Sequence, residues 1–131
     1  AKSRELDAHP WASAVFWWPN SSRQIRAVGQ AYRLERPQVE AYFATRPRGS
    51  QIGAWASRQS QPLASRADLD VARDEAQRRF AEGDVPCPPY WGGFVIDVTE
   101  FEFWQGQSGR SHDRVVTRRI GDIWEAQRLH P

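Results

Sequence analysis

Two segments of the chain gather polar side chains among aromatic ones, and the first of them is suited to binding a phosphate group. It reads YFATRPRGSQIGAWASRQS over residues 42–60. Arg46 follows Tyr42 by four residues, which places both on one face of a helix, and Ser50 lies just past a Pro-Arg-Gly break. A guanidinium group donates two charge-assisted hydrogen bonds to one anion, and the hydroxyls add further donors. These residues alone leave open the alternative of a solvated arginine beside a core tyrosine.

The second segment reads EFWQGQSGRSHDR over residues 102–114 and combines cations with an imidazole. A strand that ends at Trp104 leads into a glycine-flanked loop. If the chain returns in extended form, Arg110, His112 and Arg114 point the same way. Two cations and an imidazole on one face pack poorly without acidic partners, so we interpret the segment as functional.

Several common chemistries are excluded by motifs that the sequence lacks. It contains no P-loop, no G-x-G-x-x-G, no C-x-x-C and no G-x-S-x-G. His9, His112 and His130 have no second histidine or cysteine at ligand spacing, so we expect no metal site. Cys87 lies between prolines with no histidine nearby, which predicts an inert thiol.

The composition is that of one domain without disulfides. A length of 131 residues fits a single domain, and one cysteine cannot form an internal disulfide, which favours a reducing compartment, the cytoplasm. Lys and Arg number 18 against 16 Asp and Glu, a net charge of +2 that does not by itself indicate nucleic acid binding. No apolar run approaches the roughly 20 residues of a membrane helix. Seven tryptophans and six phenylalanines indicate flat apolar surfaces at a pocket or interface.

In the first half of the chain, a hairpin and a short helix must position these side chains. Residues 12–18 form an apolar run typical of a buried strand, and residues 24–34 alternate as a second strand paired with it. An apolar i, i+3, i+4 pattern from Val39 predicts a short helix that ends before Pro47. The stretch 48–60, rich in Gly, Ser and Gln, is predicted as a loop or irregular helix.

The second half of the chain predicts one more helix and then strands. Ser65 and Asp68 cap the helix, and Gly83 ends it. Residues 84–93, with three prolines and two glycines, form a rigid connector. Strand-like segments follow at residues 94–98, 101–105, 114–118 and 123–128. The sum is a strand-rich α+β fold with two helices.

Six sequence motifs, in order along nearly the whole chain, match one known family. They are RQIRAVG at 23–29, YFATRPRGSQIGAWASRQS at 42–60, PPYWGGF at 88–94, EFWQG at 102–106, RSHDR at 110–114 and RLHP at 128–131. Through them the chain resembles the pyridoxamine 5′-phosphate oxidases, which are FMN-dependent enzymes that make pyridoxal 5′-phosphate.

The resemblance implies a role for individual residues. It implies that FMN is bound by Lys2, Gln24, Gln59, Ser60, Trp104 and Arg114, with Lys2 on the phosphate. It implies that the substrate phosphate is held by Tyr42, Arg46 and Ser50. Arg110, Ser111 and His112 match the segment that covers the pyridine ring, with Arg110 over the reacting carbon and His112 orienting the ring.

The resemblance also implies the fold, the assembly and the reaction. The fold is an antiparallel, Greek-key-like split β-barrel with flanking helices, and two chains form a homodimer with FMN at the interface. A hydride passes from the 4′ carbon of pyridoxine or pyridoxamine 5′-phosphate to the flavin, and dioxygen reoxidises the flavin to give hydrogen peroxide. Residues 1–131 then form a single domain, the C-terminal two thirds of such an oxidase, and further strands and a substrate-binding lysine should precede residue 1.

Two other hypotheses remain open. The family's usual Arg-Leu-His-Asp-Arg has Ser111 in place of leucine, which favours a related split-barrel flavin oxidase acting on another aromatic substrate, of the phenazine pathway type. The intact RPRGSQIGAWAS stretch disfavours that hypothesis. The third hypothesis is a non-catalytic fragment that binds FMN or pyridoxal phosphate, or only dimerises, because absent strands would expose sheet edges. We expect neither a nucleic acid nor a membrane as a partner.

Overall fold

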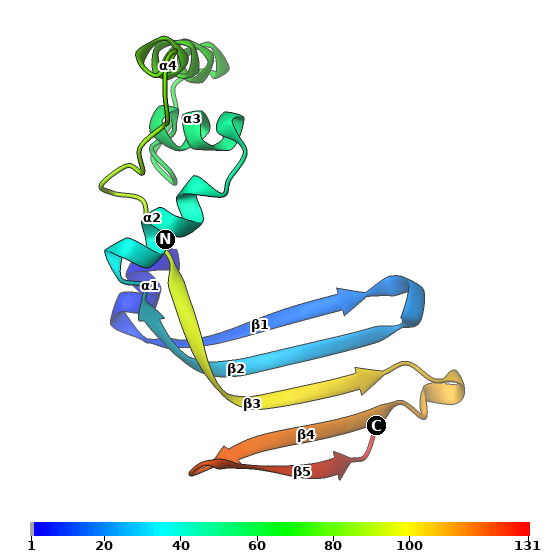
Figure 1. Ribbon diagram of the computed structural model, residues 1–131. Coiled ribbons are helices and arrows are strands. Elements are labelled where there is room, and N and C mark those ends of the chain that lie inside the picture. The colour runs from blue at the N-terminus through cyan, green and yellow to red at the C-terminus, as the bar shows by residue number, and fades with distance from the viewer. Residues whose placement is uncertain (1) are drawn as a thin grey trace. The chain divides into compact units, whose positions relative to one another are not determined.

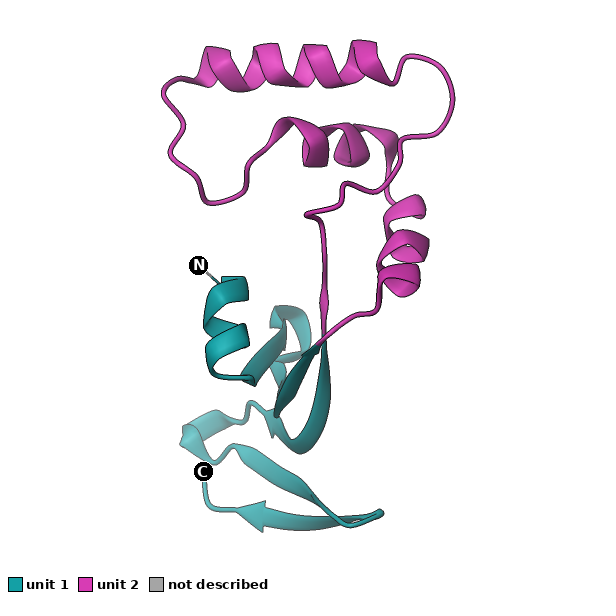
Figure 2. Cartoon of the chain, turned by 90° about the vertical axis from the view of Figure 1, so that its left-hand side faces the viewer, with its two compact units in different colours: residues 1–32, 95–131 teal, residues 33–94 magenta. Residues whose placement is uncertain are grey.

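The computed structural model describes residues 2–131, which form two compact units (Figures 1 and 2). Unit 1 contains the described residues up to Tyr32 together with Val95–Pro131, and unit 2 contains Arg33–Phe94. In chain order the elements are α1 (Lys2–Ala8), β1 (Trp11–Trp18), the 3-10 turn η1 (Pro19–Ser21), β2 (Arg23–Arg33), α2 (Arg36–Ala44), α3 (Arg48–Ala56), α4 (Arg66–Arg79), β3 (Phe94–Gln105), the 3-10 turn η2 (Ser108–Arg110), β4 (Asp113–Ile120) and β5 (Ile123–Leu129).

Unit 1 is built on one five-stranded sheet in the order β1-β2-β3-β4-β5, and neighbouring strands run antiparallel (Figure 1). The predicted hairpin of the first two strands is confirmed, with Trp17 opposite Gln24. In the last two pairs of strands, Trp104 lies opposite Arg114, and Arg114 lies opposite Leu129. Residues directly opposite each other share a face of the sheet, so these registers decide which side chains can meet.

The prediction that the first strand is buried is wrong. Val15, Phe16, Trp17 and Trp18 of β1 remain between 47% and 57% exposed. β1 is an edge strand with β2 as its neighbour in the sheet. Hydrophobicity identifies such a strand, but it does not say whether the covering surface belongs to the same chain.

The two strand segments predicted at 94–98 and 101–105 are one continuous strand, β3. The predicted break fell at Thr99 and Glu100, and glutamate is a poor strand former. Glu100 and Glu102 nevertheless continue the strand, since each accepts hydrogen bonds from Arg26 of β2. Cross-strand ion pairing thus overrides the local preference.

Unit 2 contains both predicted helices and one that the sequence left as a loop or irregular helix. In α4, the Ser65 hydroxyl accepts a hydrogen bond from the main-chain N–H of Asp68 at 3.2 Å, which confirms the predicted cap. α3 is a regular helix despite its glycines, because Ile52 is buried and Gln51 donates to the main-chain oxygen of Phe43 at 3.0 Å.

With α1, four α-helices are described where the sequence predicted two. Phe43 from α2, Ile52 from α3, Ala76 from α4 and Val85 from the connector form the buried core of unit 2. None of the helices in residues 2–131 is both long and apolar enough to cross a membrane.

Candidate functional site

Three residues predicted to bind FMN lie on one face of the sheet in unit 1. Trp104 and Arg114 are directly opposite in β3 and β4, so their side chains point the same way. Gln24 is opposite Trp17, whose ring centre lies 6.0 Å from that of Trp104. The structure therefore brings Gln24, Trp104 and Arg114 together on one surface. We call the surface formed by Trp17, Gln24, Trp104 and Arg114 the Trp104 face.

A pocket of about 530 Å³ lies at the end of the sheet where β2 begins and β3 ends. Gln24 and Trp104 border it, but Phe103, Val115 and Asp113, which also line it, lie on the opposite face of the sheet because neighbouring residues of a strand alternate between faces. Apolar walls with a few polar groups suit a largely aromatic ligand.

Arg114 has an acidic partner that sequence reasoning missed. Its Nε donates to Oε1 of Glu102 at 2.7 Å, and Nη2 of Arg26 donates to Oε2 of Glu102 at 2.9 Å. Glu102 is 9% exposed. Burial by itself would raise the pKa of Glu102, but the hydrogen bonds from Arg26 and Arg114 outweigh it and hold the pKa below its usual value. The sequence predicted both strands, but the register of β3 with β4 is needed to see that Glu102 and Arg114 meet.

His112 lies beside the Trp104 face. Its ring centre is 4.7 Å from that of Trp104. The main-chain N–H of Gln107 donates to Nδ1 of His112 at 3.2 Å. Because Nδ1 accepts this bond, the proton of the neutral imidazole sits on Nε2, which is left as a donor.

The prediction that Arg110, His112 and Arg114 alternate along an extended return is wrong. The chain becomes a strand at Asp113, and Arg110 ends the turn η2 with a φ of 60°. Gly109, at a φ of 65°, lets the turn reverse sharply before the strand begins.

Two predicted site residues, Ser60 and Arg110, have a left-handed backbone conformation. Among residues 2–131, the non-glycine residues with positive φ are Ser22, Ser60 and Arg110. Such conformations cost free energy and concentrate at functional sites. Gln59 and Ser60 lie exposed in unit 2, in the turn that follows α3, and Lys2 is exposed at the start of α1.

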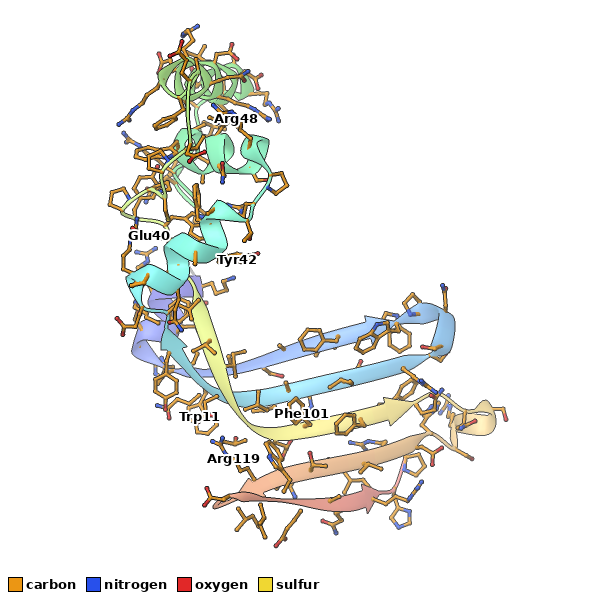
Figure 3. The ribbon with its side chains drawn as sticks, viewed as in Figure 1. Trp11, Glu40, Tyr42, Arg48, Phe101 and Arg119 are labelled. Atoms are coloured by element: carbon orange, nitrogen blue, oxygen red, sulfur yellow. The ribbon has the colours of Figure 1, made fainter. Side chains whose placement is uncertain are left out.

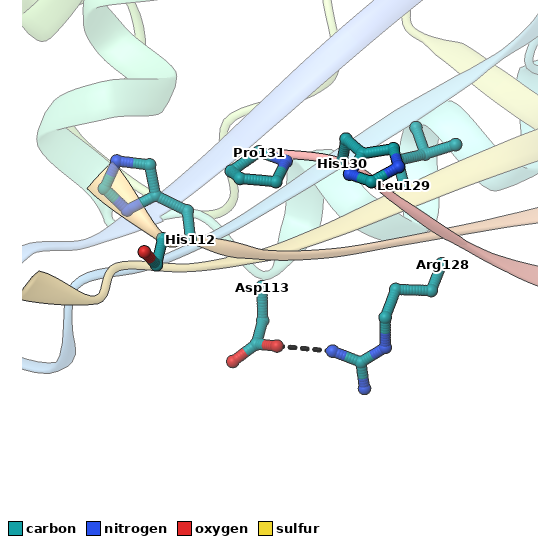
Figure 4. A pocket seen from close by; sticks show the side chains of 7 residues that line it. His112, Asp113, Arg128, Leu129, His130 and Pro131 are labelled. Carbon is teal, nitrogen blue, oxygen red and sulfur yellow. Dashed lines mark hydrogen bonds and ion pairs between the residues drawn. The ribbon is translucent and has the colours of Figure 1, made fainter. Parts of the chain in front are cut away.

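A second pocket, of about 360 Å³, lies where the loop before β4 meets the C-terminal residues (Figure 4). Asp113 and Arg128 form an ion pair at its wall. The predicted substrate residues Ser111 and His112 both line this pocket. The remaining lining residues are Leu129, His130 and Pro131.

The predicted phosphate-binding residues lie in unit 2, where Tyr42 projects from α2 (Figure 3). Arg46 lies beyond the end of α2, so the prediction that it shares a helical face with Tyr42 is wrong. Both instead contact Trp91: the Tyr42 ring centre is 6.1 Å from it, and the guanidinium carbon of Arg46 lies 5.0 Å above it. Ser50 is half-buried in the first turn of α3, where the helix dipole favours an anion.

Arg46 has a buried hydrogen-bond donor that no acceptor of the described chain satisfies. Among residues 2–131, its Nη1 is the buried side-chain nitrogen or oxygen that has no hydrogen-bond partner. The ring of Phe43 lies on another side of the same guanidinium, 6.0 Å from its carbon. An unpaired buried donor costs about 1–3 kcal/mol, which indicates that an acceptor belongs there. No three His, Cys, Asp or Glu side chains of the same residues gather into a cluster that could hold a metal ion.

Two protein-family models together match most of the chain. The model described as pyridoxamine 5′-phosphate oxidase matches residues 1–79. The model described as pyridoxine 5′-phosphate oxidase C-terminal dimerisation region matches residues 91–131.

Curated relatives agree with these models. A pyridoxine/pyridoxamine 5′-phosphate oxidase from Rubrobacter xylanophilus is 48% identical over 99% of this chain and 60% of its own length. The protein of that name from Azorhizobium caulinodans is 50% identical over 100% of this chain and 63% of its own length. The chain therefore spans about 60% of the length of the curated relatives it matches.

Solved structures show the same fold. PhzG from Burkholderia lata 383, in complex with tetrahydrophenazine-1-carboxylic acid, superposes with a TM-score of 0.91 at 32% identity, over 99% of this chain and 63% of that one. A pyridoxamine 5′-phosphate oxidase-related, FMN binding protein from Nostoc punctiforme superposes with a TM-score of 0.76 at 15% identity, over 100% of this chain and 68% of that one. The predicted α+β split barrel is confirmed. With two family models and relatives at this level of identity, the chain belongs to the pyridoxamine 5′-phosphate oxidase family.

Proposed function

We propose that the chain is the flavin- and substrate-binding part of an oxidase that converts pyridoxine 5′-phosphate and pyridoxamine 5′-phosphate to pyridoxal 5′-phosphate. Dioxygen is the electron acceptor and hydrogen peroxide is a product; with pyridoxamine 5′-phosphate the reaction also consumes water and releases ammonia. The observation that carries the proposal is the buried, unpartnered Nη1 of Arg46. The names of relatives that are 43–50% identical support the same substrate class.

Arg46 holds the substrate phosphate. Its guanidinium is oriented by Trp91 and Phe43, so little side-chain freedom is lost when an anion binds. A phosphate oxygen would accept from Nη1 and remove the unfavourable free energy of the unpaired donor. The hydroxyls of Tyr42 and Ser50 supply further donors for the same group.

The Trp104 face suits FMN. Trp17 and Trp104 offer flat apolar surface, Gln24 offers amide donors and acceptors, and Arg114 offers a positive charge. FMN held on this face would supply the hydride acceptor and the route of the electrons to dioxygen. Lys2, Gln59 and Ser60 complete the set of FMN-binding residues that we propose.

Arg110 and His112 position the substrate for hydride transfer. His112 presents Nε2–H as a donor, because its Nδ1 already accepts from Gln107. Arg110 supplies a guanidinium at the tip of the loop, held there by its left-handed backbone. Aligning donor and acceptor in this way contributes much of the rate acceleration in such reactions. Ser111 lies between the two and contacts the same ligand.

We propose that the functional form is a cytoplasmic homodimer with FMN at the interface. The match of residues 91–131 to a dimerisation region supports this assembly. Exposed aromatic side chains on β1, among them Phe16 and Trp18, provide apolar surface for a partner to cover.

A second candidate function is the oxidation of a phenazine-type aromatic substrate. The similarity to PhzG, which binds tetrahydrophenazine-1-carboxylic acid, supports this candidate, as does Ser111 in place of leucine. That ligand carries a carboxylate and no phosphate. The comparison of phosphorylated and unphosphorylated substrates therefore separates the two functions.

Replacing Arg46 with alanine tests the proposal. We expect Arg46→Ala to weaken the binding of pyridoxine 5′-phosphate by about 1.5–3 kcal/mol, the loss of a charged hydrogen bond, and to change the binding of pyridoxine far less. Titration calorimetry on the FMN-loaded protein measures both. Arg48→Ala is the matched control, because the Arg48 guanidinium donates to the main-chain oxygens of Phe80 and Gly83 in the same unit.

Two results would contradict the proposal. Equal losses for pyridoxine 5′-phosphate and pyridoxine in the Arg46→Ala protein would remove Arg46 from the phosphate site. A chain that does not retain FMN after desalting would contradict the flavin site and leave the non-catalytic fragment as the better hypothesis.

A further inference from the structure

A series of alternating positive and negative side chains runs along the same side of the sheet as Trp104 and ends at Arg114. Arg118 donates to Oε2 of Glu100 at 2.9 Å, and Arg26 donates to Oε1 of Glu100 at 3.0 Å. Arg26 also donates to Oε2 of Glu102 at 2.9 Å. Arg114 closes the series, with both Nε and Nη2 at 2.7 Å from Oε1 of Glu102. Each carboxylate is therefore shared by two guanidinium groups.

Glu102 occupies the most buried place in this series. Its side chain is 11% exposed, against 22% for Glu100, and both of its oxygens accept from arginine. A carboxylate in such surroundings is stable only while it is fully hydrogen-bonded. The cations around it hold the pKa of Glu102 below its usual value, so it stays ionised and keeps both contacts at neutral pH.

The two ends of the series differ in their surroundings, and Arg114 is the end that lies on the Trp104 face. The five side chains carry three positive and two negative charges, 3 − 2 = +1, and Glu125 of β5 lies directly opposite Arg118 at one end of the series. At one end, the Arg118 side chain is 56% exposed, so water screens its charge. At the other end, Arg114 is 32% exposed, and its Nη1 donates to the main-chain oxygen of His130 at 3.2 Å.

We propose that Glu102 is a positioning residue for flavin binding, because it fixes the guanidinium of Arg114 on the Trp104 face. The inference rests on the proposed binding of FMN. Arginine side chains carry about 2 kcal/mol of rotamer entropy, and a two-point contact removes that freedom before the ligand arrives. Glu102 restrains Arg114 without contacting FMN. Arg26 holds Glu102 in place by donating to its other carboxylate oxygen, Oε2.

The test compares two glutamines at neighbouring places in the series. Glu102→Gln removes the charge that holds Arg114, whereas Glu100→Gln removes a charge of the same series that contacts Arg26 and Arg118. FMN dissociation constants are measured by quenching of flavin fluorescence, well below the thermal midpoint of each protein. We expect Glu102→Gln to weaken FMN binding about tenfold, comparable to the loss of one charged hydrogen bond, and Glu100→Gln to change it less than about twofold.

A second measurement reports on Arg114 without FMN. The Nε–H group of Arg114 should give a slowly exchanging NMR signal in the wild-type protein, and the signal should be lost in Glu102→Gln and kept in Glu100→Gln. If Glu102→Gln does not fold, Glu102→Asp keeps the charge but shortens its reach, and it should show the same loss of signal and of FMN affinity.

Each outcome decides the inference. Equal FMN affinities in the two glutamine variants, with the Arg114 signal intact in both, would overturn the positioning role and leave the proposed function standing. If the wild-type chain does not bind FMN, the proposed function fails and the flavin role of Glu102 fails with it, although the Arg114 signal still reports whether Glu102 holds the guanidinium.

Discussion

The two units differ in where they place their large apolar side chains. In unit 2, Phe43 is 1% exposed, and its ring meets Trp91 edge-on at 5.1 Å. In unit 1, the buried apolar residues among those described are Ala27, Ala31 and Val116, all of them small or medium in size. The large aromatic side chains of the sheet lie largely at its surface instead. Unit 2 thus packs Trp55, Phe80 and Trp91 against its buried Phe43 and exposes Tyr42 and Tyr90, whereas unit 1 buries no large aromatic side chain among its described residues.

This difference agrees with the two roles that we propose. A site for one phosphate needs a rigid frame around a single guanidinium, and the core of unit 2 provides it next to Arg46. A site for a flavin, and an interface with a second chain, need a broad apolar surface such as the sheet offers. The sheet of unit 1 should therefore gain much of its stability from ligand and partner.

The largest expected effect comes from removing an aromatic ring in each unit. Phe43→Ala leaves a cavity in the core of unit 2 and should lower the free energy of unfolding by about 3–5 kcal/mol. Trp17→Ala removes a ring that is 51% exposed, so the loss should stay below about 1 kcal/mol in the unliganded chain. Urea unfolding followed by circular dichroism measures both.

The comparison of the units would fail if the two alanine variants were destabilised equally. Adding FMN would sharpen the comparison. FMN should raise the free energy of unfolding of the Phe43→Ala protein but not that of the Trp17→Ala protein.

A smaller effect is expected from two glycines, one in each unit. A Cβ on Gly29 of β2 would lie 2.1 Å from the main-chain oxygen of Asp97, and main-chain atoms cannot rotate away. Gly29→Ala should therefore push β2 and β3 apart and lower the free energy of unfolding by about 1–3 kcal/mol. A Cβ on Gly53 of α3 meets nothing within 4 Å, so Gly53→Ala should raise it by about 0.5–1 kcal/mol.

Thermal unfolding of the two glycine variants measures the contrast. A stable Gly29→Ala protein would mean that β2 and β3 have room to separate, and the close approach between them would then contribute nothing to the sheet.

Local sequence patterns predicted those elements whose signals are local. The helix beginning after Ser65 has its cap within the segment itself, although it ends at Arg79 and not at the predicted Gly83, and the first hairpin follows from alternation and a turn. The elements that were missed depend on distant contacts. α3 is held by burial of Ile52 against other helices, and β3 is continuous because Arg26 pairs with two glutamates in it.

The candidate site likewise contains residues that local sequence patterns predicted and one residue that they missed. The residue types in the segments 42–60 and 102–114 predicted Arg46, His112 and Arg114 as functional candidates, and these remain predictions about ligand binding. Glu102 was missed as the partner of Arg114, because the register of β3 with β4 was needed to place them together. Single-chain patterns indicate which residues have unusual chemistry, and three-dimensional contacts reveal which other residues hold them in place.

The smallest expected effect concerns the cap of α4. Ser65→Ala removes the acceptor for the Asp68 N–H and should destabilise α4 by about 1 kcal/mol, whereas Ser65→Asp keeps an acceptor and should stay close to wild type. Amide hydrogen exchange locates the change: we expect faster exchange in α4 and unchanged exchange in β2 and β3, because each unit has its own buried residues. Faster exchange throughout the sheet would mean that the two units open together, and that the core of unit 2 also supports the sheet of unit 1.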